Sequence, residues 1–201
     1  MDKAIAIQRL NREIRNCKKC PLWKTRKNAV PGEGLLNAKI MIIGQAPGSE
    51  ENKTGRPFVG RAGQFLNQLL KTVKIKREKV FITSPIKCFP SKNRKPKKEE
   101  INACLPYLKK QIEIINPPKF ILLGEVAFKI FFSDKKLKNC RGKVITLRPI
   151  QQVQGRPEVF EGRQAQGKKK YFITYHPAAG LRFPKIKKIL EKDFKKLKNL
   201  K

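Results

Sequence analysis

The sequence is short of acidic residues and of long apolar runs. It has 15 Asp and Glu residues against 48 Lys and Arg residues, and its formal net charge is +33. A field of this strength attracts polyanions, so nucleic acid is the leading partner and its binding should depend on salt. No apolar run approaches the roughly 20 residues that a bilayer-spanning helix needs, which excludes an integral membrane protein.

The sequence also lacks a secretion signal, internal repeats and domain linkers. The first residues lack the continuous apolar region of a secretion signal, so we expect the reducing compartment of the cytoplasm. No internal repeat or domain linker divides the 201 residues, and we expect residues 1–201 to form a single domain. Residues 151–170 mix glycine and proline with polar side chains, which predicts a loop or β-hairpin insertion.

Short continuous apolar runs alternate with segments of helical periodicity. Runs of this kind are typical of strands buried on both faces of a parallel sheet, and the alternation favours an α/β fold with helices on both sides. The predicted strands are 39–44, 79–83, 119–124 and 171–175, and the predicted helices cover 7–14, 65–73, 101–115 and 186–197. Residues 85–98, rich in proline and lysine, are predicted to form a basic loop.

Four of the five cysteines form two spaced pairs. Cys17 and Cys20 are separated by two residues, Cys88 and Cys104 by fifteen, and Cys140 stands alone. In a reducing compartment such a pattern suggests metal or redox chemistry before structural disulfides. The alternative for Cys88 and Cys104 is that they are small buried apolar residues. Four thiolates could hold zinc or an iron–sulfur cluster, and the spacing alone does not choose between them.

Ligands of open α/β sheets bind beyond the carboxyl ends of the strands. We therefore expect the site among residues 45–48, 84–88, Glu125 and 176–180. The segment after the first strand resembles a P-loop, but it lacks the glycine that should precede Lys53. His176 is the only histidine, and a neutral imidazole at this edge can donate one hydrogen bond to a developing anion.

Four motifs in this order resemble the family-4 uracil-DNA glycosylases, the iron–sulfur type of thermophilic archaea and bacteria. They are residues 44–48, residues 54–63, residues 80–83 leading to Lys87 and Cys88, and residues 176–179. The resemblance extends from Cys17 to the C-terminal helix. It implies a three-layer α/β/α fold with a central four-stranded parallel sheet. It also implies a structural [4Fe-4S] cluster on Cys17, Cys20, Cys88 and Cys104.

The family's reaction is the removal of a deaminated base, most often uracil, from DNA. The base is flipped out of the helix and its N-glycosidic bond is hydrolysed, which leaves an abasic site. The resemblance implies a set of uracil-binding residues, comprising Gln45, Ala46, Phe58, Ser84 and His176. The residues it implies for catalysis are His176, Gln45 and Glu51.

Two positions depart from the family pattern. Gln45 stands where the family usually has glutamate, and it can orient a water molecule but cannot take its proton. Glu51 is expected to compensate or to guard the pocket against the methyl group of thymine. Ser84 replaces an asparagine that reads uracil, and its hydroxyl can donate or accept only one bond. Two alternatives therefore stay open: a glycosylase for hypoxanthine or xanthine, and an iron–sulfur DNA-binding protein with weak or no excision.

Contacts with DNA are expected from two segments. Lys92, Arg94 and Lys95 lie in the basic loop, and we expect them to contact phosphates. Leu181 and Arg182 follow the His-Pro motif, and the resemblance implies that they fill the gap left by the flipped base. The expected partner is DNA that contains uracil or another deaminated base. A replication clamp is a candidate protein partner, and we expect a monomer.

Overall fold

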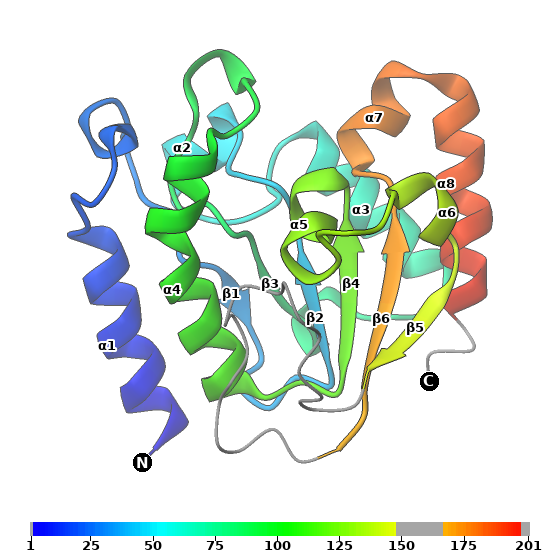
Figure 1. The fold of residues 1–201 in the computed structure, drawn as a ribbon, viewed down its shortest axis with the longest axis horizontal. Helices are drawn as coiled ribbons and strands as arrows, with labels where there is room; N and C mark the ends of the chain where they lie inside the picture. The colour runs from blue at the N-terminus through cyan, green and yellow to red at the C-terminus, as the bar shows by residue number, and fades with distance from the viewer. Residues whose placement is uncertain (1, 148–166, 198–201) are drawn as a thin grey trace.

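The structure is a computed structural model, and it describes residues 2–147 and 167–197. A six-stranded sheet runs through its centre with the strand order β1-β3-β2-β4-β6-β5 (Figure 1). The strands are β1 (Glu33–Gly34), β2 (Ile40–Ile43), β3 (Phe81–Thr83), β4 (Lys119–Leu123), β5 (Val144–Leu147) and β6 (Lys169–Thr174).

Helices cover both faces of the sheet and make the outer two of three layers (Figure 1). The helices on one face are α1 (Lys3–Arg15), α4 (Lys98–Ile115), α5 (Glu125–Phe131) and α6 (Leu137–Cys140). Those on the other face are α3 (Arg61–Thr72) and α8 (Pro184–Lys196). The short helices are α2 (Ser49–Thr54), α7 (Pro177–Arg182), η1 (Pro21–Lys24), η2 (Arg77–Lys79) and η3 (Ser91–Asn93).

Side chains of the central strands alternate between two apolar cores. In β2, Met41 and Ile43 pack into the core beneath α1 and α4, while Ile42 packs into the core beneath α3 and α8. In β4, Phe120 and Ile121 divide in the same way. Since both faces of these strands are buried, every buried position in β2 and β4 is apolar, and this explains the continuous apolar runs. The prediction of an α/β fold with helices on both faces is confirmed.

The prediction of a four-stranded sheet was wrong in its strand count. The inner strands β3, β2, β4 and β6 run parallel, but β1 and β5 pair antiparallel at the two edges. β1 is two residues long, and β5 has half-exposed side chains, so neither has an apolar run to mark it. β6 begins at Lys169, inside the predicted insertion at 151–170, of which residues 151–166 lie outside the described residues.

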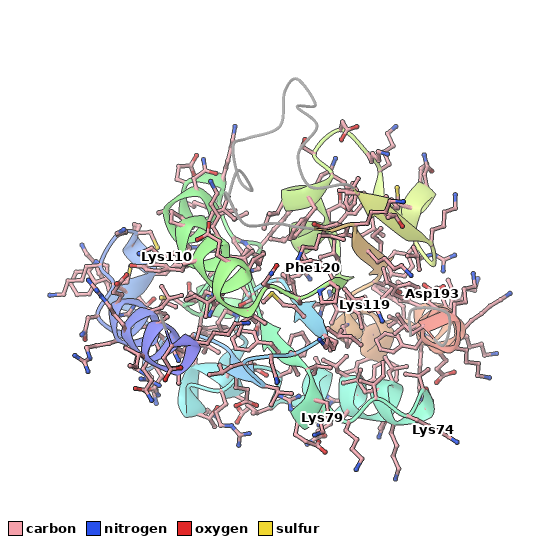
Figure 2. All side chains as sticks on the ribbon, turned by 90° about the horizontal axis from the view of Figure 1, so that it is seen from below. Lys74, Lys79, Lys110, Lys119, Phe120 and Asp193 are labelled. Carbon is pink, nitrogen blue, oxygen red and sulfur yellow. The ribbon has the colours of Figure 1, made fainter. Side chains whose placement is uncertain are left out.

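The outer surface is basic. α8 illustrates this, because it buries Leu190 and Phe194 and leaves Lys185, Lys188 and Lys192 exposed. Figure 2 shows many side chains ending in nitrogen that project around the outline of the fold. None of the described helices combines the length and the apolar character needed to cross a membrane. α8 is therefore amphipathic, with one face in the core and the other carrying positive charge.

Candidate active site and cysteine pocket

The four inner strands end at the same edge of the sheet. The Gly44 N–H donates to the Thr83 carbonyl at 2.9 Å, and the Gly124 N–H donates to the Thr174 carbonyl at 2.9 Å, so neighbouring strand ends are bonded to each other. A Cβ added to Gly124 would lie 3.0 Å from the His176 Cβ and 3.2 Å from the Gln45 Cδ. The fold therefore brings Gln45 and His176 together against this glycine, as the motif positions predict.

His176 caps the N-terminus of α7. Its Nδ1 accepts a hydrogen bond from the Ala178 N–H at 3.2 Å, so the proton of the neutral ring resides on Nε2. Although the side chain keeps some contact with solvent, burial by the surrounding protein atoms lowers the pKa of His176 from 6.5 to about 4. At neutral pH this histidine is uncharged, and Nε2 is a hydrogen-bond donor.

Phe58 lies beside the His176 ring. The two rings are stacked with their centroids 5.5 Å apart and an interplanar angle of 29°. The Phe58 backbone is left-handed, with φ at 51°, which is rare for a bulky residue. A Cβ on Gly44 would lie 2.7 Å from the Phe58 ring, and one on Gly63 would lie 1.9 Å from the Phe58 carbonyl oxygen. Glycine at both positions is what allows the aromatic ring to approach the end of β2.

Glu51 holds the backbone on one side of Phe58. Its Oε1 accepts the N–H groups of Val59 at 2.9 Å and Gly60 at 3.0 Å, and its Oε2 accepts the N–H of Gly48 at 3.0 Å. These bonds join the glycine-rich segment after β2 to the chain that follows Phe58. The position of Glu51 is therefore fixed by three backbone amides.

Arg77 holds the backbone on the other side. It donates to the Pro57 carbonyl at 2.6 Å, to the Phe58 carbonyl at 3.3 Å and to the Glu33 carboxylate at 3.1 Å. Burial would raise the pKa of Glu33, but the hydrogen bonds and charges of Arg56 and Arg77 outweigh it and lower the pKa. Sequence reasoning missed this pair, because nothing in the local pattern links partners that lie far apart in the chain.

Ser84 follows β3 and is buried. Its hydroxyl donates to the Ile86 carbonyl at 2.6 Å, so the hydroxyl proton is already used within the chain. The sequence leaves open whether this hydroxyl donates or accepts. In the structure its O–H donates to the Ile86 carbonyl, so the Ser84 oxygen offers only lone pairs to a ligand.

Lys87 is a buried lysine that sequence reasoning assigned no role. Its Nζ donates to the Thr83 hydroxyl at 2.6 Å, the Ser84 carbonyl at 2.7 Å and the Gln111 Oε1 at 2.7 Å. Burial lowers the pKa of Lys87 to about 7, whereas the sulfurs of Cys104 and Cys88 act to raise it. A lysine directly before a buried cysteine, between apolar residues, was the available signal for an unusual environment.

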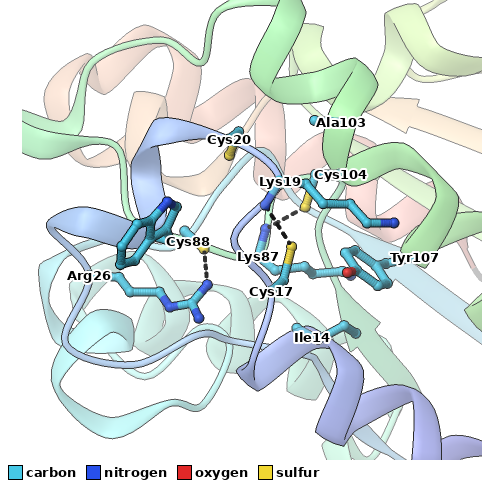
Figure 3. Close-up of a pocket in the computed structure, with 11 residues that line it drawn as sticks. Ile14, Cys17, Lys19, Cys20, Arg26, Lys87, Cys88, Ala103, Cys104 and Tyr107 are labelled. Carbon is cyan, nitrogen blue, oxygen red and sulfur yellow. Dashed lines mark hydrogen bonds between the residues drawn. The ribbon is translucent and has the colours of Figure 1, made fainter.

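The cysteine pocket lies between the end of α1, the segment after β3, and α4 (Figure 3). Cys17, Cys20, Cys88 and Cys104 all line it, so the structure gathers the two spaced pairs predicted from the sequence. Several N–H groups point at the sulfurs. Arg26 Nη1 donates to Cys88 at 3.1 Å, the Lys87 N–H to Cys104 at 3.3 Å and the Lys19 N–H to Cys17 at 3.5 Å.

Burial favours the protonated form of two of these thiols. Burial raises the pKa of Cys104 to about 12, and burial also raises the pKa of Cys88 despite the hydrogen bond from Arg26. Such thiols keep their protons until a metal replaces them. Within residues 2–147 and 167–197, no three metal-ligating side chains are arranged to hold a single metal ion. Cys140 is buried at the end of α6 and does not line this pocket.

Comparisons with known proteins identify the family of this chain. The family model of the Uracil DNA glycosylase superfamily matches residues 31–198. A type-4 uracil-DNA glycosylase of Sulfurisphaera tokodaii is 44% identical over 196 residues, which cover 97% of this chain and 84% of the relative. The chain belongs to the type-4 uracil-DNA glycosylases. A second member, from Pyrobaculum aerophilum, is 45% identical over 93% of this chain and 90% of its own length. A third, from Saccharolobus solfataricus, is 46% identical over 92% of this chain and 82% of its own length.

The basic loop of this type-4 chain lies beside the edge of the sheet that holds the site. Lys92 and Lys95 are exposed, whereas Arg94 makes a two-point ion pair with the buried Glu100 at 2.6 and 2.9 Å. That pair lowers the pKa of Glu100 and fixes the loop to the start of α4. A Cβ on Gly48 would lie 3.6 Å from an oxygen of Asn93, which places the loop next to the segment after β2.

The second predicted DNA contact of the type-4 chain is at α7. Leu181 is 41% exposed, and Arg182 is exposed beside it at the end of the helix. A Cβ on Gly180 would lie 2.8 Å from both Leu190 and Phe65, so α7 packs closely on α3 and α8. This contact holds the short helix in place while its outer side chains project. Phe183, which sequence reasoning did not single out, is 51% exposed next to them.

Proposed function

We propose that this chain removes uracil from DNA by hydrolysing the N-glycosidic bond, and that it leaves an abasic site. The main observation behind this proposal is that His176 is a neutral imidazole with its proton on Nε2. Its ring stacks on Phe58 at the carboxyl edge of the sheet. The names of the relatives, which are type-4 uracil-DNA glycosylases, support the same reaction. In this proposal His176 acts as a hydrogen-bond donor and not as a cation.

Base binding would use the groups that the fold has already positioned. A base within a duplex cannot be reached, so it must be flipped out at a cost of a few kcal/mol of stacking and pairing. We infer that the flipped uracil stacks on Phe58 and that the backbone amides of Gln45 and Ala46 meet its carbonyl oxygens. The Ser84 oxygen would accept a hydrogen bond from the N3–H of uracil, because its own O–H already donates to the Ile86 carbonyl. Cytosine has a lone pair at N3, so this acceptor disfavours it.

The bond between the sugar and the base breaks with its electron pair moving to uracil. His176 donates from Nε2 to an oxygen of the departing uracil anion, and one donor of this type stabilises a transition state by about 3–4 kcal/mol. Water then forms the new bond to the sugar carbon and releases a proton to solvent. Gln45 would orient this water, and Glu51 would act by holding Phe58 through three backbone amides.

We also propose that Cys17, Cys20, Cys88 and Cys104 hold a [4Fe-4S] cluster. Four cysteines around one pocket, with N–H donors directed at three of the sulfurs, match the ligand chemistry of such clusters. A cluster of four irons is larger than one ion, so its ligands need not converge on a single point. When bound, it would join the N-terminal segment, the chain after β3 and α4, and the excision reaction needs no electron transfer.

Two observations favour alternatives to efficient uracil excision. Gln45 cannot take a proton from water, and Ser84 offers a single contact to the base. Slow uracil excision, excision of hypoxanthine or xanthine, or DNA binding without excision would each fit these residues. Their common feature is a DNA partner, which the exposed basic loop and the net charge of +33 support. The replication clamp, the monomeric state and the cytoplasmic location stay predictions.

The test is an excision assay on single-stranded and duplex oligonucleotides that carry uracil, hypoxanthine or xanthine. Alkaline cleavage of abasic sites reports release, and we expect it with uracil. Ser84→Asn and Gln45→Glu should each raise the rate if base contact and water positioning limit the reaction. Absence of release from all substrates, in the unaltered protein and in both variants, would leave the DNA-binding function in place of the enzyme.

A further inference from the structure

Lys87 is one of the residues that line the cysteine pocket (Figure 3), and its side chain also contacts the base-binding edge of the sheet. Its side chain turns back to the end of β3, where Nζ donates to the Thr83 hydroxyl, the Ser84 carbonyl and the Gln111 side chain, all within 2.7 Å. An ammonium group has three N–H donors, and here each has an oxygen acceptor. The reaction described above makes no use of this group.

The backbone of Lys87 is fixed as firmly as its side chain. Its N–H donates to the Cys104 sulfur at 3.3 Å, and its carbonyl accepts the Val30 N–H at 2.7 Å. The next residue is Cys88, which lines the cysteine pocket. A single residue therefore connects the turn that begins at Ser84 to the pocket wall.

Stability alone does not account for a lysine at this place. Burying an ammonium group costs several kcal/mol of solvation, and an apolar side chain of similar length would fill the space at lower cost. The ammonium group adds a requirement for geometry, because three acceptors must converge on it: one from β3, one from the turn that follows β3 and one from α4. One of these acceptors is the backbone of Ser84 itself.

We propose that Lys87 is a positioning residue for base recognition. Its hydrogen bond to the Ser84 carbonyl holds the turn from Ser84 to Cys88 in one conformation. In that conformation the Ser84 hydroxyl donates to the Ile86 carbonyl and presents its oxygen as an acceptor to the base. This inference rests on the proposed function. Without the Lys87 ammonium group, the Ser84 carbonyl loses its hydrogen-bond donor and the turn can change its conformation. The hydroxyl can then rotate and donate, which removes its preference for a base with an N3–H.

The test is Lys87→Met, compared with the unaltered holoprotein. The primary readout is the ratio of dissociation constants for two non-cleavable DNAs, one carrying 2′-fluoro-deoxyuridine and the other 2′-fluoro-deoxycytidine. We expect the preference for the uracil analogue to fall about 10-fold, the effect of one positioned hydrogen bond. In the excision assay, KM for uracil DNA should rise more than kcat falls. Iron content should stay at the level of the unaltered protein.

The matched control is Lys169→Met, at the opposite end of the sheet. Lys169 Nζ also bonds two oxygens, those of Asn116 and Pro117, so this change removes a similar group far from the base. We expect it to leave the binding preference unchanged. Equal binding preferences in Lys87→Met, Lys169→Met and the unaltered protein would overturn the inference. So would loss of iron in Lys87→Met, because Lys87 would then support the cysteine pocket instead of the base.

A second variant covers the case in which Lys87→Met does not fold. Thr83→Val keeps the shape of the strand residue and removes one acceptor of Nζ. It should lower the binding preference in the same direction by a smaller factor, and an unchanged preference would overturn the inference. Failure of the proposed function is seen separately, since the unaltered protein would then release no uracil at all.

Discussion

The base-binding edge and the cysteine pocket are held together in different ways. At the edge, Phe58 is fixed by hydrogen bonds within the chain. The two amides that follow it donate to Glu51, and Arg77 donates to the carbonyls of Pro57 and of Phe58 itself. In the pocket, the sulfurs of Cys17, Cys88 and Cys104 each receive one N–H donor, and the thiols come from three segments that are separate in the sequence.

The difference concerns what each region needs from outside the chain. The edge has its shape before any ligand binds, because its hydrogen bonds are internal. The pocket holds thiols whose pKa is raised by burial, and the proposed cluster would replace their protons and complete the bonds of the pocket. We therefore expect a change at the pocket to affect the whole fold, and a change at the edge to affect recognition and rate.

Cys88→Ser should have the largest effect. A protein with the proposed cluster is expected to be brown and to absorb at ~400 nm. Removing one of the four ligands should abolish this absorbance and lower the thermal midpoint, since metal binding contributes to folding free energy. Iron analysis and thermal unfolding measure both. Cys140→Ser is the control, because Cys140 is equally buried but outside the pocket, and it should keep its iron. A Cys88→Ser protein with full iron content would contradict the proposed ligand set.

His176→Ala should follow, with a loss of roughly 10²–10³-fold in the single-turnover rate of uracil excision. The iron content should not change, and this separates the edge from the pocket. Alanine also removes the cap of α7, so His176→Asn serves as the control that restores an acceptor for the Ala178 N–H. If asparagine recovers the full rate, excision does not need an imidazole at this position.

Glu51→Gln should have a smaller effect, about 10-fold on the excision rate. Both carboxylate oxygens accept backbone N–H groups, and an amide can accept on one side only, so part of the support for Phe58 is lost. Glu50→Gln is the matched control, since Glu50 is exposed and pairs with Lys53 at the surface. Equal rates for the two variants would show that the three backbone bonds do not shape the site.

The smallest effect is expected from pH. Because the pKa of His176 is lowered from 6.5 to about 4, the folded protein keeps a neutral ring between these values, while the unfolded chain takes up a proton. The contribution of this group to stability is complete above pH 6.5 and is lost as pH falls toward 4. The kcat/KM for uracil DNA should be flat from pH 8 to about 5. An inflection near 6.5 that His176→Asn abolishes would contradict the burial of this group.

Apolar patterning was sufficient to predict the layered fold but not the edges of the sheet. Strands buried on both faces leave a continuous apolar run, as in β2 and β4. The two-residue β1 and the half-exposed β5 leave none, because their pairing is decided by neighbours distant in sequence. The helices α2 and α7 were also missed, since each is only six residues long and begins in a glycine- or proline-containing segment.

The positions of Gln45, Ser84 and His176 just after strands of the sheet could be predicted, because each follows a continuous apolar run. The residues that hold the site in place could not be predicted, because Arg77, Glu33 and Lys87 act through contacts made only after folding. The donor state of Ser84 also depends on a carbonyl two residues away, which no residue pattern reports.

The order of the functional groups along the chain has a consequence for biosynthesis. All four cysteines of the pocket come before α5, whereas His176 follows β6 near the end of the chain. At about 5–20 residues per second, a ribosome finishes the last cysteine segment on the order of seconds before the histidine segment emerges. The four cysteines proposed to bind the cluster are therefore synthesised while the base-binding edge is still incomplete.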